Sequence, residues 1–91
     1  MTYSFASSFD RLFKRLPTDR RRRVQLAVNR LIDLLDLGHR PAGLGLKLLR
    51  KEIWEFRIGL RDRVVLKLER SSVIFLIVGN HEDVQRDLKR M

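Results

Sequence analysis

Hydrophobic and polar residues alternate through the second half of the chain. Residues 53–58 (IWEFRI) and 63–69 (RVVLKLE) show the period of two that is typical of half-buried strands. Residues 73–78 (VIFLIV) are apolar on both faces, which favours a central strand that is covered on at least one side. A turn that begins at Gly59–Leu60 and a second turn at residues 70–72 (RSS) separate the three segments. The pattern predicts a β-hairpin followed by a central strand.

The first half has helical periodicity instead. Residues 2–5 form a short predicted strand, and Ser7 or Ser8 is expected to cap a helix that starts immediately after it and ends at Pro17. A second, longer helix follows, and Gly38 stands in the position that a C-cap glycine favours. Residues 38–46 (GHRPAGLGL) are predicted to be a loop, and residues 82–90 a short C-terminal helix. The apolar stripes of the two main helices are Phe9, Leu12, Phe13 and Leu16, then Val24, Val28, Leu31 and Leu35.

This order of elements predicts the fold class. A strand, two helices, three strands and a short last helix indicate an α+β fold. The two helices are expected to pack on one face of a small twisted antiparallel sheet and to leave the other face open. At 91 residues the chain is expected to be one domain, residues 1–91.

Charge narrows the classes of partner. The chain has 20 Lys and Arg against 11 Asp and Glu, a net charge of +9. Such a charge attracts nucleic acid, with an acidic protein as the main alternative. No segment combines a basic face with a broad apolar one, and no apolar run approaches the roughly 20 residues that span a membrane. The chain has no cysteine and no signal-like start, so we expect a soluble cytoplasmic protein without a membrane partner.

Four charged residues are expected on the open face of the hairpin: Glu55, Arg57, Arg63 and Lys67. If the two strands pair, Arg57 and Arg63 lie near each other, and they repel unless an anion sits between them. The alternative interpretation is an ordinary solvated face. A similar choice applies to Arg20–Arg23 on the second helix, whose basic side chains are either solvated or in contact with a phosphate backbone.

The two histidines differ in their surroundings. His81 follows Gly79–Asn80 at the end of the last strand, where it can titrate near neutral pH and act as a general acid or base. The alternative for His81 is a structural hydrogen bond at a helix start. His39 in the glycine-rich loop is predicted to be a surface residue. Two separated histidines without cysteines do not favour a zinc site, so no metal and no cofactor are expected.

Several segments together resemble a known family. They are FASSFDRLFKRLP before a long helix, the G-L–L-K-L-L segment before the hairpin, WEFRIG–RDRVV, and FLIVGNHEDV. In order and spacing, the chain resembles the RelE/ParE superfamily of bacterial toxin–antitoxin toxins, nearer the RelE-like mRNA interferases. The resemblance implies a compact toxin with two helices on a twisted antiparallel sheet. Relatives cut mRNA, commonly in the ribosomal A site, and are neutralised by a cognate antitoxin that wraps them.

Carried onto this chain, the resemblance implies a catalytic site of Glu55, Arg57 and Arg63 on the hairpin and His81 after the last strand. We expect RNA to be bound by further cations, namely Lys47, Lys51, Arg61 and Lys67. Many relatives have an aromatic residue near Val84–Gln85, and this chain does not. The implied activity is an endoribonuclease that works without a metal on mRNA at the ribosome. Two alternatives remain open: a ParE-like inhibitor of DNA gyrase, and a non-catalytic RNA- or ribosome-binding module.

Overall fold

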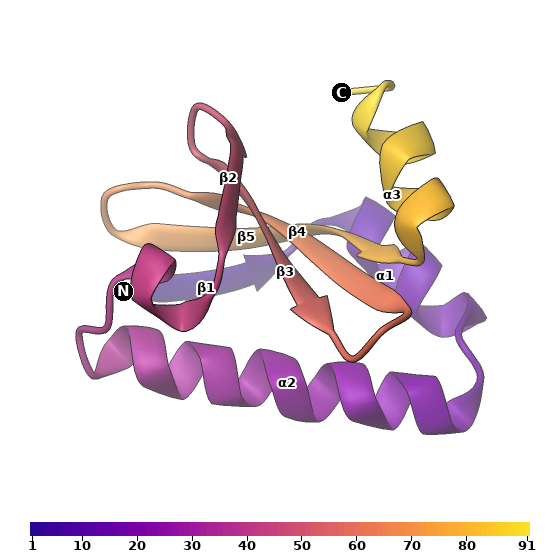
Figure 1. Ribbon diagram of the computed structural model, residues 1–91, viewed down its shortest axis with the longest axis horizontal. Coiled ribbons are helices and arrows are strands. Elements are labelled where there is room, and N and C mark those ends of the chain that lie inside the picture. The colour runs from indigo at the N-terminus through magenta and orange to yellow at the C-terminus, as the bar shows by residue number, and fades with distance from the viewer.

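The structure is a computed structural model that describes residues 1–91 (Figure 1). Its elements, in chain order, are β1 (Thr2–Phe5), α1 (Ser7–Arg15), α2 (Thr18–Asp36), a 3₁₀ turn η1 (Pro41–Leu44), β2 (Lys47–Arg50), β3 (Ile53–Ile58), β4 (Asp62–Leu68), β5 (Ser72–Gly79) and α3 (His81–Leu88). The predicted α+β fold is confirmed, with helices and strands in the expected order.

The five strands form one sheet in the order β1-β5-β4-β3-β2. The pairs β2–β3, β3–β4 and β4–β5 are antiparallel, whereas β1 runs parallel to β5 at the edge. The sequence patterns missed β2, because four residues after a glycine-rich loop are too few to show a period of two. The predicted hairpin is confirmed, and Arg57 pairs directly with Arg63 across it.

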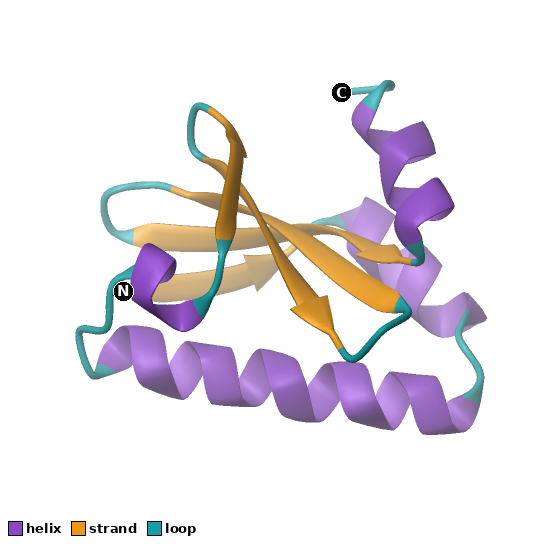
Figure 2. Cartoon of the chain, in the orientation of Figure 1, coloured by secondary structure: helices purple, strands orange, loops and turns teal.

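Helices cover both faces of the sheet (Figures 1 and 2). The long α2 runs under one face, and α3 lies on the opposite side against β4 and β5. The prediction of an open second face is therefore wrong over the part that α3 covers. Val84 of α3 is fully buried, and so is Val65 of β4, which the alternation of the strand places on the face that is predicted to be open. Burial of Val84 explains how so short a helix is held, since its own hydrogen bonds alone are marginal.

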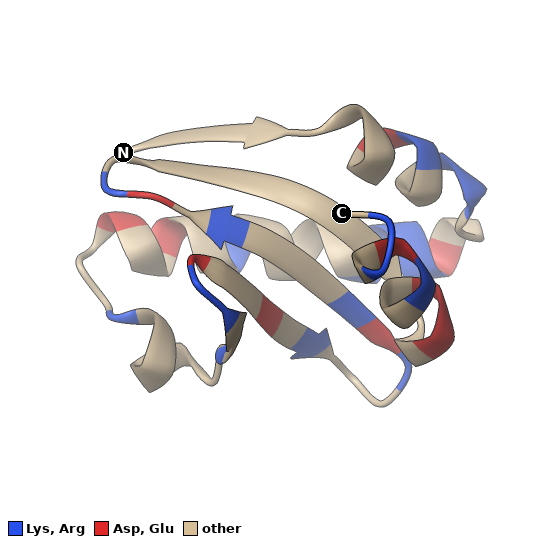
Figure 3. Ribbon diagram, turned by 90° about the horizontal axis from the view of Figure 1, so that it is seen from above, with Lys and Arg blue, Asp and Glu red and all other residues tan.

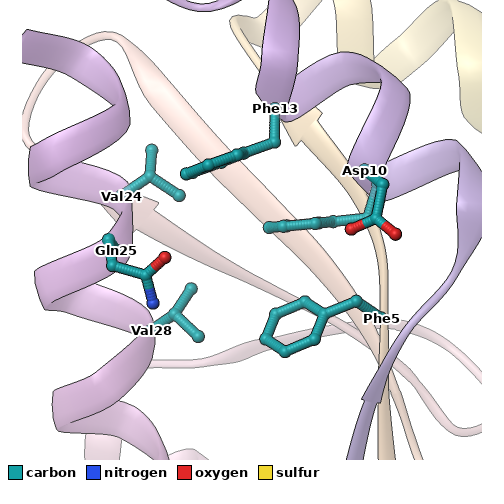
Figure 4. Close-up of a pocket in the computed structure, with 7 residues that line it drawn as sticks. Phe5, Asp10, Phe13, Val24, Gln25 and Val28 are labelled. Carbon is teal, nitrogen blue, oxygen red and sulfur yellow. The ribbon is translucent and has the colours of Figure 1, made fainter. Parts of the chain in front are cut away.

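The main core lies between the sheet and the first two helices. The predicted stripe of α2 is confirmed, because Val24 and Val28 are almost fully buried. At the β1 edge, Phe75 of β5 stacks on Phe5 with ring centroids 4.9 Å apart and lies 6.1 Å from Phe9. A small apolar groove of about 160 Å³ opens here between α1 and α2 (Figure 4). Its lining residues are Phe5, Phe9, Phe13, Val24 and Val28, with Asp10 and Gln25 as polar members.

Tyr3 fixes β1 to the end of α2 and gives a first test of the fold. Its hydroxyl lies 2.7 Å from Asp36 Oδ1, to which it donates, and 3.3 Å from the carbonyl oxygen of Ile32. Burial, and then this hydrogen bond, raise the pKa of Tyr3 from 10.0 to about 12. Because the pKa of Tyr3 is higher in the folded state than in the unfolded state, the protonated hydroxyl stabilises the fold. This contribution is fully present below pH ~10 and is lost as the pH rises through the pKa of the folded state.

Tyr3 is the only tyrosine of the chain, so its titration can be followed alone by tyrosinate absorbance. We expect a midpoint near pH 12 while circular dichroism shows the fold intact, and a midpoint near ~10 in denaturant. Asp36→Asn removes the charge that opposes ionisation and should lower the folded midpoint. A folded midpoint equal to the denatured one would contradict the described contact.

Candidate functional site

A polar hollow lies on the sheet beside β2, β3 and β4. It has a volume of about 430 Å³ and no hydrophobic lining residue. The residues that line it are Gly45, Lys47, Glu55, Arg57 and Arg63. The register explains the grouping, because Lys47 pairs with Glu55 across β2–β3 and Arg57 pairs with Arg63 across β3–β4. Basic and acidic bands accordingly lie side by side on these strands (Figure 3).

Glu55 and Arg63 form an ion pair at the floor of the hollow. Arg63 Nη1 donates to Glu55 Oε1 over 3.2 Å, and the two side chains are only 18% and 6% exposed, respectively. A buried carboxylate needs such a partner, because desolvation penalises an unpaired charge. The bond occupies Oε1, and Oε2 makes no hydrogen bond within the protein. Glu55 is therefore fixed in place with one oxygen still available.

The other two cations of the hollow are free. Arg57 and Lys47 are exposed, and neither forms an ion pair or a side-chain hydrogen bond. Three cationic side chains against one carboxylate leave the hollow with a formal charge of +2. Such a site attracts an anion, and the fork of a guanidinium fits a phosphate with two hydrogen bonds. The hollow is suited to a phosphate group that lies next to an available carboxylate oxygen.

His81 is the first residue of α3 and lies in a second, more open hollow with Leu60, Arg61, Asn80 and Glu82. The structural hydrogen bond considered for His81 is absent. Asn80 caps the helix instead. Its side-chain Oδ1 accepts a hydrogen bond from the backbone N–H of Asp83 over 2.8 Å, and Oδ2 of Asp83 accepts one from the backbone N–H of Asn80. The imidazole of His81 is therefore exposed and unbound.

The structure thus divides the predicted site into two neighbouring hollows that share no lining residue. Glu55, Arg57 and Arg63 come together with Lys47, whereas His81 comes together with Arg61. The two hollows are linked through the sheet, since Arg63 of the first pairs with Gly79, two residues before His81.

Two predicted RNA-binding residues lie outside both hollows. Lys51 is exposed in the turn between β2 and β3, at the other end of the hairpin from Arg57. Lys67 pairs across β3–β4 with Ile53 at that same end, and its ammonium lies 3.9 Å from Glu69. The roles predicted for these two lysines stay predictions.

The sequence patterns missed one buried ion pair, between Arg20 and Asp62. The run Arg20–Arg23 predicts basic side chains that are solvated or in contact with a phosphate backbone, and for Arg20 this prediction is wrong. Its side chain is 17% exposed and that of Asp62 5%, and Arg20 Nε and Nη2 both donate to the Asp62 carboxylate, Nε over 3.2 Å. The hydrogen bond to Asp62 raises the pKa of Arg20 further. The sequence does contain a signal for this burial. Arg20 stands four residues before Val24, so it continues the apolar stripe of α2 that faces the core.

No three His, Cys, Asp or Glu side chains lie close enough together to hold a metal ion. None of the helices is both long enough and apolar enough to span a membrane.

Comparison with known proteins shows the fold. No family model and no curated protein matches the sequence. Among solved structures, a chain of the RelB–RelE antitoxin–toxin complex from Methanococcus jannaschii superposes with a TM-score of 0.66 at 18% identity, over 91% of this chain and 95% of that one. The fold is that of RelE. YafQ from Escherichia coli has this RelE fold too, with a TM-score of 0.68 at 16% identity, over 90% of this chain and 94% of YafQ.

A third solved structure extends the comparison to a second toxin–antitoxin complex. A chain of RelBE2 from Mycobacterium tuberculosis superposes with a TM-score of 0.57 at 22% identity, over 90% of this chain and 92% of that one. At such low identities the likeness concerns the RelE fold alone. The chemistry that this chain can perform depends on the residues in the two hollows.

Proposed function

We propose that this protein is the toxin of a type II toxin–antitoxin system and that it cleaves mRNA without a metal. The main support is the hollow that gathers Lys47, Arg57 and Arg63 around the fixed carboxylate of Glu55. It lies on a fold shared with proteins of two toxin–antitoxin complexes. RNA supplies the remaining group, because its own 2′-hydroxyl is the nucleophile.

In the proposed reaction, Arg57, Arg63 and Lys47 bind the scissile phosphate and stabilise the charge that develops on its oxygens. The 2′-oxygen attacks phosphorus while its proton passes to the free oxygen of Glu55, and the bond from phosphorus to the 5′-oxygen breaks. Protonated His81 gives its proton to that departing oxygen. The products are a 2′,3′-cyclic phosphate and a 5′-hydroxyl.

The division into two hollows suits a substrate that is held in place by something larger. His81 and Glu55 line different hollows, so one RNA strand has to lie across both for the two groups to act together. A strand fixed in the ribosome meets this need, because positioning lowers the barrier without any new chemical group. We therefore propose that cleavage depends on the ribosome and takes place in the cytoplasm.

The proposed partner protein is a cognate antitoxin. Two of the similar folds were solved in antitoxin–toxin complexes. The apolar groove between α1 and α2 offers such a partner a protein-binding surface (Figure 4). The net charge of +9 favours an acidic partner for the same chain.

The function is tested by inducing the wild type and His81→Ala in bacteria and mapping mRNA ends. We expect growth arrest with new 5′-hydroxyl ends in translated mRNA for the wild type. His81→Ala should cut about 100-fold more slowly, a typical loss for a general acid, because water is a poor substitute donor. His39→Ala is the matched control, since this exposed histidine lies in neither hollow, and it should cut like the wild type.

Other outcomes point to the alternatives. Arrest without new mRNA ends, together with inhibited supercoiling by gyrase, would replace the ribonuclease by a gyrase inhibitor. Salt-sensitive RNA binding without arrest or cuts would indicate a binding module. Full cleavage by His81→Ala would remove His81 from the mechanism and leave the proposed toxin function standing.

A further inference from the structure

The Arg20–Asp62 pair joins two elements that are far apart in sequence. Arg20 lies in the first turn of α2, and Asp62 is the first residue of β4. Two nitrogens of one guanidinium bind the two oxygens of one carboxylate, and both side chains are largely buried. A bidentate pair fixes direction as well as distance, which a single point contact does not.

Asp62 stands between the residues of the two hollows. Arg61, before it, lines the hollow of His81, and Arg63, after it, lines the hollow of Glu55. Because successive side chains of a strand point to opposite faces, the carboxylate of Asp62 points away from Arg61 and Arg63, toward α2. Arg20 therefore holds the backbone of residues 61–63 from the α2 side of the sheet and lines neither hollow.

The same place is tied to the start of α3. Gly79 pairs with Arg63, and a β-carbon at Gly79 would lie 2.7 Å from Cβ of Asp83, so strand and helix are in close contact there. Asp83 in turn closes the capping box that starts α3. The negative charge of Asp83 adds to the raised pKa of Arg20, after the larger effect of Asp62. Residues 61–63 and the start of α3 therefore meet at one place, and Arg20 binds it through Asp62.

We propose that Arg20 is a positioning residue, which through Asp62 sets the placement of Arg63 and His81 relative to each other. Only the kinetic test of this proposal, which measures RNA cleavage, rests on the proposed function. The proposal deepens that function, because it names a residue outside both hollows on which the alignment of phosphate-binding and proton-donating groups depends.

The decisive variant replaces both members, Arg20→Met with Asp62→Leu. Removing one member alone leaves an unpaired buried charge, whereas an apolar replacement of both is often neutral for stability. If the pair only stabilises the fold, the folded double variant cleaves like the wild type. If it positions the site, kcat on ribosome-bound mRNA falls about 100-fold with KM unchanged, the loss expected for a displacement of about 1 Å.

Two single variants complete the kinetic arm. Arg20→Lys keeps the charge but not the fork, so we expect kcat between those of the wild type and the double variant. Leu35→Ala, at the opposite end of α2, lowers stability without touching this region and should keep the wild-type kcat. A wild-type kcat in the double variant, or an equal loss in Leu35→Ala, would overturn the proposal.

Amide hydrogen exchange tests the positioning without any cleavage. Relative to the centre of β5, amides of residues 61–63 and 79–83 should exchange at least about tenfold faster in the double variant than in the wild type. Leu35→Ala should not change this ratio. Unchanged exchange in the double variant would overturn the positioning, whereas a wild type that cuts no RNA would overturn the proposed function and leave this result valid.

Discussion

Arg57→Ala is expected to lower the rate of RNA cleavage by about 10²- to 10³-fold and to leave the fold as stable as before. Arg57 is exposed and has no ion pair and no side-chain hydrogen bond, so its removal costs no native contact of that kind. In the proposed mechanism its guanidinium faces the scissile phosphate beside Arg63. Loss of one preorganised donor to a developing charge has an effect of this size.

The measurement is single-turnover cleavage of a ribosome-bound mRNA, with thermal unfolding as the check on stability. Arg22→Ala is the matched control, because it removes the same charge from an exposed position of α2 that lines neither hollow. A purely electrostatic effect of the net charge would lower the cleavage rates of both variants equally. Equal losses for Arg57→Ala and Arg22→Ala would therefore contradict a specific role for Arg57 in the hollow.

Arg63 offers no such clean test, and the comparison shows how the two arginines differ. Arg63 is held by the buried carboxylate of Glu55, so removing it also leaves that charge without its partner. A slow Arg63 variant would combine lost phosphate binding with a displaced Glu55. Arg57, which has no ion pair, is therefore the better probe of phosphate binding. Arg63 connects phosphate binding to the carboxylate of Glu55.

The hairpin site could be predicted from the sequence because it depends on local rules. Alternation along β3 and β4 fixes which residues share a face, so the sequence places Arg57 and Arg63 near each other if the strands pair. Their direct pairing is a finding of the structure. The sequence predicts Lys47 as an RNA-binding residue, but the place of Lys47 opposite Glu55 depends on β2, which the sequence patterns missed. Four residues are too short for periodicity to distinguish from a loop.

The parts that could not be predicted depend on contacts between distant segments. The sequence favours a short last helix, but nothing local places it against β4 and β5, and Val65 of β4 is fully buried. The separation of His81 from Glu55 has the same origin, since it depends on where α3 begins in space. The ion pair of Arg20 with Asp62 joins residues 42 positions apart, and the charge of each alone indicated an exposed side chain.

Phe75→Ala is expected to lower the free energy of unfolding by about 3–5 kcal/mol, the usual cost of emptying a buried phenylalanine site. Phe75 is completely buried in the central strand β5 and contacts the rings of Phe5 and Phe9. Removing it opens a cavity where the sheet, β1 and α1 meet, and these elements cannot collapse around it without losing their pairing. Small domains are typically stable by only about 5–15 kcal/mol, so much of the margin is lost.

Phe5→Ala is the matched control for this loss. It deletes the same ring from the same aromatic stack, but Phe5 is 40% exposed, so the cost should stay below about 2 kcal/mol. Urea unfolding followed by the fluorescence of Trp54, the only tryptophan, measures both variants. Equal losses would mean that the partly exposed ring of Phe5 stabilises the fold as much as the fully buried ring of Phe75, contrary to the burial of the two rings. A larger loss for Phe75, with an unchanged m-value, would locate the stability of this fold in the sheet that also carries the hollow of Glu55 and Arg63.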